Sequence, residues 1–469
     1  MTARAGARRA VCLMIASALA AGCGPSDQPA SDAPAAAVAR EPAPPPRHVL
    51  LVSIDTLRAD HLGCYGYPKP TSPQLDALAA ESIVFDNAWA TAPWTLPSHA
   101  SLLTGLYPSH HGARKQRDGL DPQVGTLAEA LRARGFATGS VVNAVFVSGY
   151  FGLNRGFDSH ALVANNERPR GTAREVTRKG LAWLDAQADT RTFLFLHYFD
   201  VHSDYTAVSR FRDFFVTEAG RLRGRTHDLT RLNLGQIRPE PRDIAHLVAL
   251  YDAGIRQLDH DLGTLFTALR ERGRLADTLV IVTADHGEEF GDHGRFSHGR
   301  HYQELLRVPL IVRLPGADRA GTRIAEPVSL VDVAPTILAA VGAEPAAPGD
   351  GVDLSPLWSG ASLGAAGRPI FAQTGPFMRD DLRSVREGEF KLILDRETGE
   401  RQLYHLAGDP GEREDVADRH PELVERLTGA IAELDAGALG ASPRVELSEE
   451  LVERLRELGY VGTEPPAGP

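Results

Sequence analysis

The sequence has few cysteines, and their positions restrict the chemistry of the folded chain. Among its 469 residues there are three, Cys12, Cys23 and Cys64. The first two lie in an N-terminal segment that we interpret as a targeting signal, so only Cys64 remains for the folded part. A single thiol cannot form an internal disulfide, and Cys64, in "HLGCYGY", is interpreted as a small packing residue.

The chain also lacks an excess of positive charge. Its 50 lysines and arginines are outnumbered by 61 acidic residues, which gives a formal net charge of -11. No basic stripe with interleaved aromatic residues is present, and aromatic residues make up only 7% of the chain. A nucleic-acid footprint is therefore excluded, and we expect no nucleic acid among the partners. The length predicts one large domain with an appendage, or two domains.

Apolar runs long enough for a membrane span are absent as well. The N-terminus has only a short apolar run. There, "VCLMIASALAAG" follows three arginines, which is typical of a secretory signal and too short for a permanent membrane span. It ends in "LAAGC", which resembles the lipobox of bacterial lipoproteins, although Ala20 stands where a leucine is usual. We predict a signal peptide over residues 1–22 and a lipid anchor at Cys23. The protein would then be exported and held on a membrane, in the periplasm or at the outer membrane. The alternative is a secreted protein cut near Ala21.

Three apolar runs that end in acidic or histidine residues predict the fold. They are "HVLLVSID" (48–55), "TFLFLHYFDVH" (192–202) and "TLVIVTADH" (278–286). Continuous apolar runs suit strands that are buried on both faces, as in a parallel sheet. Helical patterns with capping signals lie between these runs, over residues 72–81, 126–135 and 242–273. This alternation predicts an α/β fold, with a mostly parallel central sheet sandwiched by helices.

The composition changes along the chain indicate four regions. After the predicted signal, residues 23–47 are rich in proline and alanine and form a tether. A catalytic domain is predicted over residues 48–345. Residues 346–469 form a smaller C-terminal α+β lobe, with a strand–turn–strand pattern in "FKLILDRETGERQLYHL", a helix in "HPELVERLTGAIAEL" and a closing helix over residues 447–460.

Two of the predicted strands end in metal-ligating residues. Asp55 follows the first run, and Asp285 and His286 follow the last. In an open α/β sheet, ligands bind beyond the carboxyl ends of the strands, so these side chains are expected to meet there. Two carboxylates and an imidazole suit one divalent cation, Zn²⁺ or Mn²⁺ first, with Ca²⁺ or Mg²⁺ as alternatives. The loop that follows, "GEEFGDHGRFSHG", contains several further ligand-type side chains.

Thr95, in "APWTLPSHASLLTGLYPSHHG", has two interpretations. It stands two residues before Pro97, and we predict a helix over Ser98–Thr104. A hydroxyl next to a divalent cation loses its proton easily, and the start of a helix favours an anion. Thr95 is therefore either a nucleophile aimed at a charged ester or simply a helix cap, and the spacing does not decide between them.

The motifs in this order resemble the sulfatase family, within the alkaline-phosphatase superfamily. The resemblance covers roughly residues 48 to 430 and rests on "VSIDTLRADHLGCYGY", "APWTLPSHASLLTGLYPSHHG", "FLFLHYFDVHSDY", "YDAGIRQLDHDLGTLF", "VIVTADHGEEFGDHG", "RVPLIVRLPG" and "LYHLAGDPGERED". It implies an alkaline-phosphatase-like fold and a metal-dependent ester hydrolase. Its expected substrate is an anionic ester in a small molecule, a glycan or a surface polymer.

Departures from the sulfatase pattern affect the expected chemistry. Sulfatases carry a Cys or Ser that is converted to formylglycine, in the pattern Cys/Ser-x-Pro-x-Arg. This chain has Thr95 there and His99 in place of the arginine, so we expect no formylglycine. The pair Asp285-His286, and His298 where a lysine is common, make the chain similar to phosphoethanolamine transferases and lipoteichoic-acid synthases. Those enzymes use a metal-bound threonine nucleophile.

The resemblance assigns roles residue by residue. It implies that the catalytic cation is bound by four residues, Asp55, Thr95, Asp285 and His286, and that Thr95 is transiently esterified.

His202 and His298 would hold substrate oxygens, protonate the leaving group or bind a second metal. Arg58 and His111 are further candidates near the same site. Arg58 is equally well interpreted as an ion-pair residue, and His111 as part of a surface loop.

Three functions follow from these observations. The first is an exported, metal-dependent hydrolase that acts through Thr95 on phosphate diesters, phosphate monoesters or phosphonate esters. The second is a sulfuric ester hydrolase that works without formylglycine, so that water must attack at sulfur. The third is a non-catalytic lipoprotein that binds glycans or anionic polymers. The third predicts damaged metal ligands, whereas Asp55, Asp285 and His286 are intact. Thr95, the Asp285-His286 pair and His298 resemble the superfamily members that act on phosphorus, so the first is preferred.

Overall fold

The computed structural model describes most of the chain after the predicted tether. The described residues are 45–163, 172–187, 189–344, 348–363, 368–374, 381–440, 442–449, 452 and 455. The predicted signal peptide, the anchor at Cys23, nearly all of the tether and most of the helix predicted over residues 447–460 lie outside them. Within the described ranges, no helix has the length and apolar character needed to cross a membrane.

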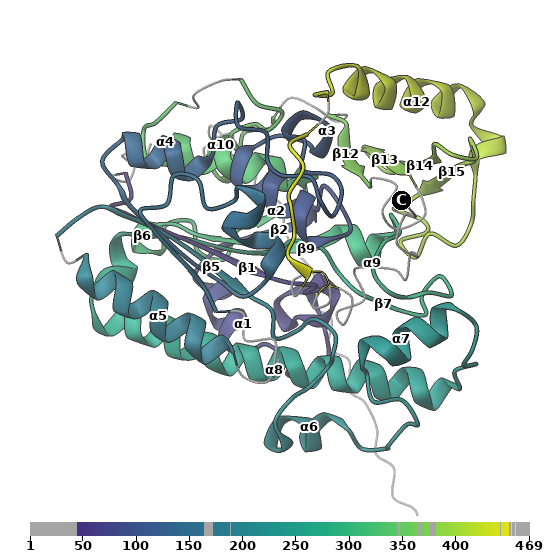
Figure 1. Ribbon diagram of the computed structural model, residues 1–469, viewed down its shortest axis with the longest axis horizontal. Helices are drawn as coiled ribbons and strands as arrows, with labels where there is room; N and C mark the ends of the chain where they lie inside the picture. The colour runs from purple at the N-terminus through teal and green to yellow at the C-terminus, as the bar shows by residue number, and fades with distance from the viewer. Residues whose placement is uncertain are drawn as a thin grey trace, which may run out of the picture. The chain divides into compact units, whose positions relative to one another are not determined.

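A nine-stranded, mostly parallel sheet forms the centre of the fold, as predicted (Figure 1). Its middle strand β1 (His48–Ile54) pairs in parallel with β5 (Thr192–Tyr198) and β6 (Thr278–Ala284). All residues of these three strands are buried, which is why they read as continuous apolar runs. The other strands are β2 (Ile83–Trp89), β3 (Ala137–Val142), β4 (Ser159–Leu162), β9 (Arg307–Arg313), β10 (Arg323–Ile324) and β11 (Val328–Ser329). The antiparallel pairs are those that β9 makes with β2 and β6.

Helices cover both faces of this sheet (Figure 1). On one face lie α1 (Pro73–Ala80), α5 (Ala173–Ala186) and the long α8 (Pro241–Glu271). On the other lie α2 (Thr95–Thr104), α4 (Leu127–Ala133) and α10 (Val333–Ala340). The remaining helices of the body are α3 (Pro108–His111), α6 (Ser209–Phe215), α7 (Thr226–Asn233), α9 (Gln303–Leu306) and α11 (Ser355–Trp358). The prediction of an α/β sandwich is confirmed.

Local sequence signals mark the starts of α1 and α4. Pro73 is the first residue of α1, and Thr126 and Glu129 form the predicted capping box of α4. The helix predicted over Ser98–Thr104 is present and ends at Thr104, but α2 begins three residues earlier than predicted, at Thr95. Pro97 does not prevent this start, since the N–H groups of a first turn have no partner within the helix.

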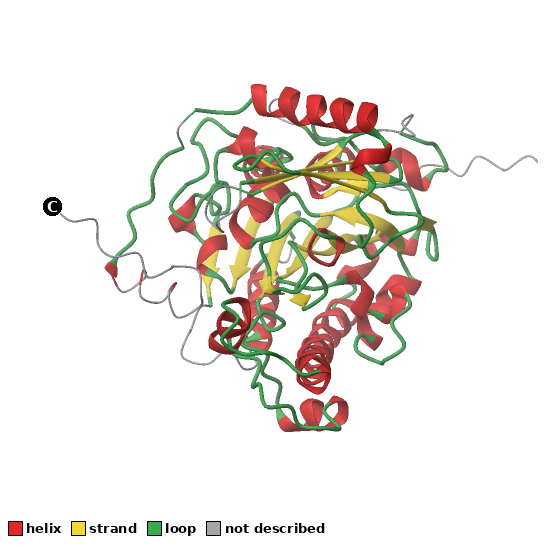
Figure 2. Ribbon diagram, turned by 90° about the vertical axis from the view of Figure 1, so that its right-hand side faces the viewer, coloured by secondary structure: helices red, strands yellow, loops and turns green. Residues whose placement is uncertain are grey.

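The C-terminal lobe is a four-stranded antiparallel sheet with a helix packed on it, as Figure 2 shows at the top of the view. Its elements are β12 (Ile370–Gln373), β13 (Leu382–Glu387), β14 (Phe390–Asp395), β15 (Arg401–His405) and α12 (Pro421–Ala436). Tyr107 and Val331 from the body are buried in the same apolar cluster as Phe371 and Leu403 of the lobe. The domain boundary at residues 345 and 346 stays a prediction.

Cys64 is a free, partly buried thiol that packs against the main core. Burial raises its pKa to about 12, so it is protonated at neutral pH.

Candidate active site

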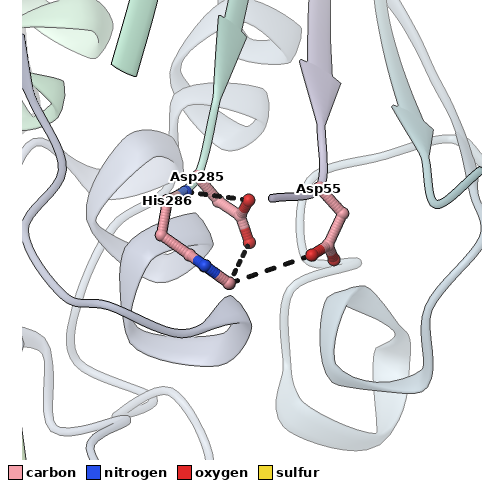
Figure 3. A group of neighbouring side chains, drawn as sticks. All are labelled: Asp55, Asp285 and His286. Atoms are coloured by element: carbon pink, nitrogen blue, oxygen red, sulfur yellow. Dashed lines mark hydrogen bonds and ion pairs between the residues drawn. The ribbon is translucent and has the colours of Figure 1, made fainter. Parts of the chain in front are cut away.

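Strand register brings the two acidic residues of the predicted metal site together. Ile54 of β1 is aligned with Ala284 of β6, so Asp55 and Asp285 leave the sheet at the same level (Figure 3). Parallel pairing is what places both carboxyl ends at one edge. The backbone N–H of Asp55 donates to the carbonyl of Tyr198 at 2.9 Å, which continues the pairing with β5 beyond the last strand residue.

Asp55, Asp285 and His286 form a buried cluster of potential ligands. His286 Nε2 lies 3.3 Å from Asp285 Oδ2 and 3.8 Å from Asp55 Oδ1 (Figure 3). None of these three atoms has a hydrogen-bond partner among the described residues, and all three side chains are fully buried. Buried polar atoms without partners are costly, whereas a cation between them would satisfy all three. The residues present therefore fit a divalent cation.

The hydrogen bonds of His286 fix its tautomer for this role. Its Nδ1–H donates to the carbonyl of Gly287 at 2.9 Å, so the lone pair is on Nε2, which faces the two carboxylates. Burial lowers the pKa of His286 well below its usual value, and the imidazole stays neutral. Burial and the neighbouring Asp55 raise the pKa of Asp285, because two adjacent buried carboxylates disfavour each other's charge.

Thr95 lies at the same site, at the first turn of α2. Its Oγ1 donates toward Asp55 Oδ2 across 3.4 Å, and the side chain is fully buried. The N-cap residue of α2 is Trp94, so the interpretation of Thr95 as a helix cap is wrong. Ser98, one turn later, donates its hydroxyl to the carbonyl of Asp285 at 2.7 Å, which fixes the start of α2 against the metal-ligand loop.

Two buried histidines that support the site were not predicted as site residues. His99 bonds the Thr95 carbonyl through Nδ1 at 2.8 Å and Ser53 Oγ through Nε2 at 2.9 Å. His197 accepts the Asn143 N–H on Nδ1 at 3.3 Å, so its Nε2–H faces Asp55 Oδ2, 3.3 Å away. Burial lowers the pKa of each histidine to about 3. His197 lies within the apolar run of β5, so the sequence gives no sign of a site residue there. It faces Asp55 because β5 pairs with β1.

His202 and His298 lie close to this cluster and to each other. Their ring centroids are 5.2 Å apart, and the ring of His298 is 4.6 Å from that of His286. The Nδ1 of His202 bonds the carbonyl of Ser203, and the Nδ1 of His298 bonds Glu288 Oε1 at 3.0 Å. Any coordination or acid–base role of the two rings therefore falls to Nε2. Glu288, fully buried, is a further residue of the site and orients His298.

The two further candidates, Arg58 and His111, do not belong to the ligand cluster. Arg58 forms ion pairs with Asp60 at 2.8 Å and Asp292 at 3.2 Å, and donates to the carbonyl of Glu288 at 3.0 Å. It therefore supports the loop that carries Glu288, as the ion-pair interpretation expects. His111 is fully buried behind α2 and is not in a surface loop, since its Nε2 lies 3.1 Å from the Pro97 carbonyl.

Thr56 follows Asp55 in a left-handed conformation, with φ of 57°. Few non-glycine residues adopt it, and here two partners hold the backbone in place. The Thr56 N–H donates to Asp285 Oδ1 at 3.2 Å, and the Tyr251 hydroxyl donates to the Thr56 carbonyl at 2.7 Å. This turn directs Asp55 and Asp285 to the same point.

A comparison with protein families decides the affiliation of this fold and site. The sulfatase family model matches residues 47–343, and the model of the N-sulphoglucosamine sulphohydrolase C-terminal region matches residues 291–436. The chain belongs to the sulfatase family. This sulfatase-family chain is an ester hydrolase with an alkaline-phosphatase-like fold and an antiparallel C-terminal lobe.

Three proteins show what this sulfatase-family chain is similar to. It is 27% identical to human arylsulfatase A over 88% of this chain and 92% of that protein. It is also 27% identical to the multifunctional alkaline phosphatase superfamily protein PehA of Trinickia caryophylli, over 72% of this chain and 81% of that one. The phosphonate monoester hydrolase of Agrobacterium radiobacter shares the fold, with a TM-score of 0.71, 22% identity, and coverage of 86% of this chain and 98% of that one.

Proposed function

We propose that this chain is a divalent-cation-dependent hydrolase that uses Thr95 as a nucleophile and prefers phosphorus esters, namely phosphate diesters, phosphate monoesters or phosphonate esters. One observation carries the proposal: the Thr95 hydroxyl faces Asp55 at the start of a helix, beside three buried ligand atoms without partners. The relative described as a multifunctional alkaline phosphatase superfamily protein supports this choice.

The residues that would hold the cation are Asp55, Asp285 and His286, with Thr95 next to them. When bound, the cation supplies positive charge that lowers the pKa of a nearby hydroxyl and stabilises negative charge on an ester oxygen. The protein supplies the rest. Asp55 Oδ2 accepts the hydroxyl hydrogen of Thr95. Because the Thr95 side chain is fully buried, it has few alternative orientations, which keeps the hydroxyl in place for attack.

In the proposed reaction, Thr95 Oγ attacks phosphorus and the ester alcohol leaves. The proton of the Thr95 hydroxyl passes to Nε2 of His202 or His298, whose Nδ1 atoms are engaged by the Ser203 carbonyl and by Glu288, and from there to the departing alkoxide. Water then attacks the phosphorus of the Thr95 ester, so that free Thr95 and the acid product are restored. The N–H groups at the start of α2 favour the anion during both steps.

The charge of the site favours substrates with one negative charge. Burial raises the pKa of the Asp55 carboxyl, and the nearby His202, His99 and His298 oppose that rise. Burial lowers the pKa of His202 and of His99, so both are neutral at pH 7. Two carboxylates and one dication give a ligand set with no net charge. Phosphate diesters and phosphonate monoesters, with one charge, therefore suit the site better than phosphate monoesters, with two.

Sulfate ester hydrolysis is the second candidate. Human arylsulfatase A and arylsulfatase K of mouse are among the relatives, and a sulfate monoester also carries one negative charge. The chemical difference is the second step, because a threonine sulfate must be attacked by water at sulfur. A formylglycine hydrate can instead release sulfate by elimination, a route that is closed to threonine.

The deciding experiment compares four aryl esters on the same protein. Metal-stripped chain is loaded with Zn²⁺, Mn²⁺ or Ca²⁺ and assayed with an aryl sulfate, an aryl phosphate, a bis-aryl phosphate and an aryl phosphonate. Thr95→Ala removes the nucleophile, and Thr95→Ser keeps the hydroxyl as the matched control. We expect the bis-aryl phosphate and aryl phosphonate to be the best substrates. Loss of ~10²-fold or more in Thr95→Ala, several kcal/mol of barrier, should be partly restored in Thr95→Ser.

Other outcomes assign the site differently. If the aryl sulfate is turned over fastest and the reaction depends on Thr95, the chain is a sulfatase without formylglycine. If Thr95→Ala retains full activity, Thr95 is not the nucleophile. Binding of a metal without turnover of any ester would favour the non-catalytic binding lipoprotein.

We also propose export and lipid anchoring through Cys23, from the "LAAGC" sequence. The test is membrane fractionation of cells that express the full chain or its Cys23→Ala variant. The wild type should sediment with membranes and incorporate labelled fatty acid, whereas the variant should do neither. Equal fractionation of the two would refute the anchor.

A further inference from the structure

The loop between β6 and β9 carries a second cluster of ligand-type side chains. Glu289, His293 and Glu304 each place one ligand atom within 4.8 Å of the others. Glu289 belongs to the short strand β7 (Glu289–Phe290), which pairs with β8 (Phe296–Ser297), and Glu304 belongs to α9. This cluster shares no residue with the catalytic ligand set.

Glu288 and Glu289 are adjacent but serve different surroundings. Side chains alternate in direction along extended backbone, so neighbouring residues face opposite ways. Glu288 bonds His298 at the active site, whereas Glu289 joins His293 and Glu304. The second cluster therefore lies on the other side of the loop that carries the catalytic histidines.

Glu289 is the observation that points to a ligand. Only 1% of this residue is exposed, and its Oε1 has no hydrogen-bond partner among the described residues. Burial, and next the Glu304 carboxylate, raise the pKa of Glu289 well above its usual value. A buried carboxylate beside a second one needs either a proton or a cation to be stable.

His293 is oriented like a metal ligand. Its Nε2 lies 3.1 Å from the Gly411 carbonyl and 3.2 Å from the Glu412 carbonyl, so this nitrogen carries a hydrogen and donates it. Metal-bound histidines generally donate their other ring N–H in this way. The Nδ1 atom is hydrogen-bonded to Glu304 Oε1 at 2.6 Å, a contact that a bound cation would replace, and the ring is stacked on Tyr302 with centroids 3.6 Å apart.

Two members of the cluster face a surface cavity. A surface cavity of about 220 Å³ is lined by His293 and Glu304 and by charged side chains of both signs, namely Asp60, Asp292, Arg58, Arg307 and Arg413. The side chains of His293 and Glu304 are 15% and 8% exposed. Glu289 lies behind these two residues and does not line the cavity itself.

We propose that Glu289, His293 and Glu304 form a second divalent-cation site, separate from the catalytic one, which fastens the catalytic loop to the C-terminal lobe. Two carboxylate oxygens and one imidazole nitrogen suit Zn²⁺ or Mn²⁺. The connection to the lobe runs through His293 to Gly411 and Glu412. This inference does not depend on the proposed ester chemistry.

The test is the metal content of the untagged full chain after chelation and dialysis against Zn²⁺, measured by mass spectrometry and by calorimetric titration. We expect two Zn²⁺ per wild-type chain, and one each in Glu289→Gln and Asp285→Asn. The double variant should bind none. Asp185→Asn is the matched control, because Asp185 is an exposed carboxylate that pairs with Arg272 and belongs to neither cluster, and it should bind two.

A second readout follows the proposed structural role. In Asp285→Asn, which keeps only the second site, Zn²⁺ should raise the melting temperature, and Glu289→Gln/Asp285→Asn should show no such rise. If Glu289→Gln does not fold, Glu304→Gln is measured in the same way.

The proposal is overturned if Glu289→Gln binds as much Zn²⁺ as the wild type. It is also overturned if the wild type binds one ion that only Asp285→Asn removes, since a proton then holds the second cluster. If the wild type binds one ion that is lost in Glu289→Gln and kept in Asp285→Asn, the second site stands and the catalytic cation is refuted.

Discussion

His111 and His110 are neighbours whose environments should give the stability of this protein opposite responses to pH. His111 is fully buried, and its Nδ1 accepts the N–H of Ala113 at 3.2 Å, so a proton on that nitrogen would face another donor. Burial lowers the pKa of His111 to about 3. The hydrogen bond to Asp350 instead raises the pKa of His110.

The size of the effect for His111 follows from proton linkage. Its pKa is 6.5 in the unfolded chain and about 3 in the folded one. Below pH 6.5 the unfolded chain therefore binds a proton that the folded chain does not, and the free energy of unfolding falls as the pH falls. Between pH 7 and pH 5.5 this one group removes about 1 kcal/mol. For His110 the sign is reversed, because the folded state binds the proton more tightly, which stabilises the protein below pH 6.5.

The assay is urea unfolding of the full chain at both pH values, followed by tryptophan fluorescence. We expect His111→Gln to lose about 1 kcal/mol less than the wild type on acidification. His110→Gln should lose more than the wild type. Any constant cost of a substitution cancels, because each variant is compared with itself at two pH values. Identical pH dependence in the wild type and His111→Gln would show that this imidazole is not buried in its neutral form, and would refute the reasoning.

Three further predictions concern residues that are not themselves proposed as metal ligands. Gly287→Ala places a Cβ 1.9 Å from the Glu304 carbonyl oxygen, so the loop must shift, and kcat/KM with the best aryl ester should fall ~10-fold or more; an unchanged kcat/KM would contradict this. Thr126→Ala removes the cap of α4 and should lower the free energy of unfolding by about 1 kcal/mol, whereas a neutral result in urea would mean that the cap is dispensable. The buried Lys391 ammonium lies 2.7 Å from the Glu412 carboxylate, and Glu412→Gln removes this counter-charge. The expected loss is about 3–5 kcal/mol, and Lys391→Met in the same chain should recover part of it; additive losses would argue against the pair.

Much of the fold could be predicted because its signals are local. The runs that begin at His48, Thr192 and Thr278 are apolar throughout, since strands buried on both faces need no polar side. Pro73 and the capping box of Thr126 mark helix starts through bonds within a few residues. Asp55, Asp285 and His286 were identifiable because ligand-type residues at strand ends meet at one edge of a parallel sheet.

The tertiary structure alone decided how these residues act together. Register aligned Asp55 with Asp285, and the contact of Ser98 with the Asp285 carbonyl fixed α2 so that Thr95 is its first residue and not its cap. The supporting role of His197 depends on a strand partner far away in the sequence. Likewise, Glu289 and Glu304 become a candidate metal site only when folding buries one beside the other. Residue type sets which chemistry is available, whereas burial and the partner atoms, which come from distant parts of the chain, decide protonation state, tautomer and direction.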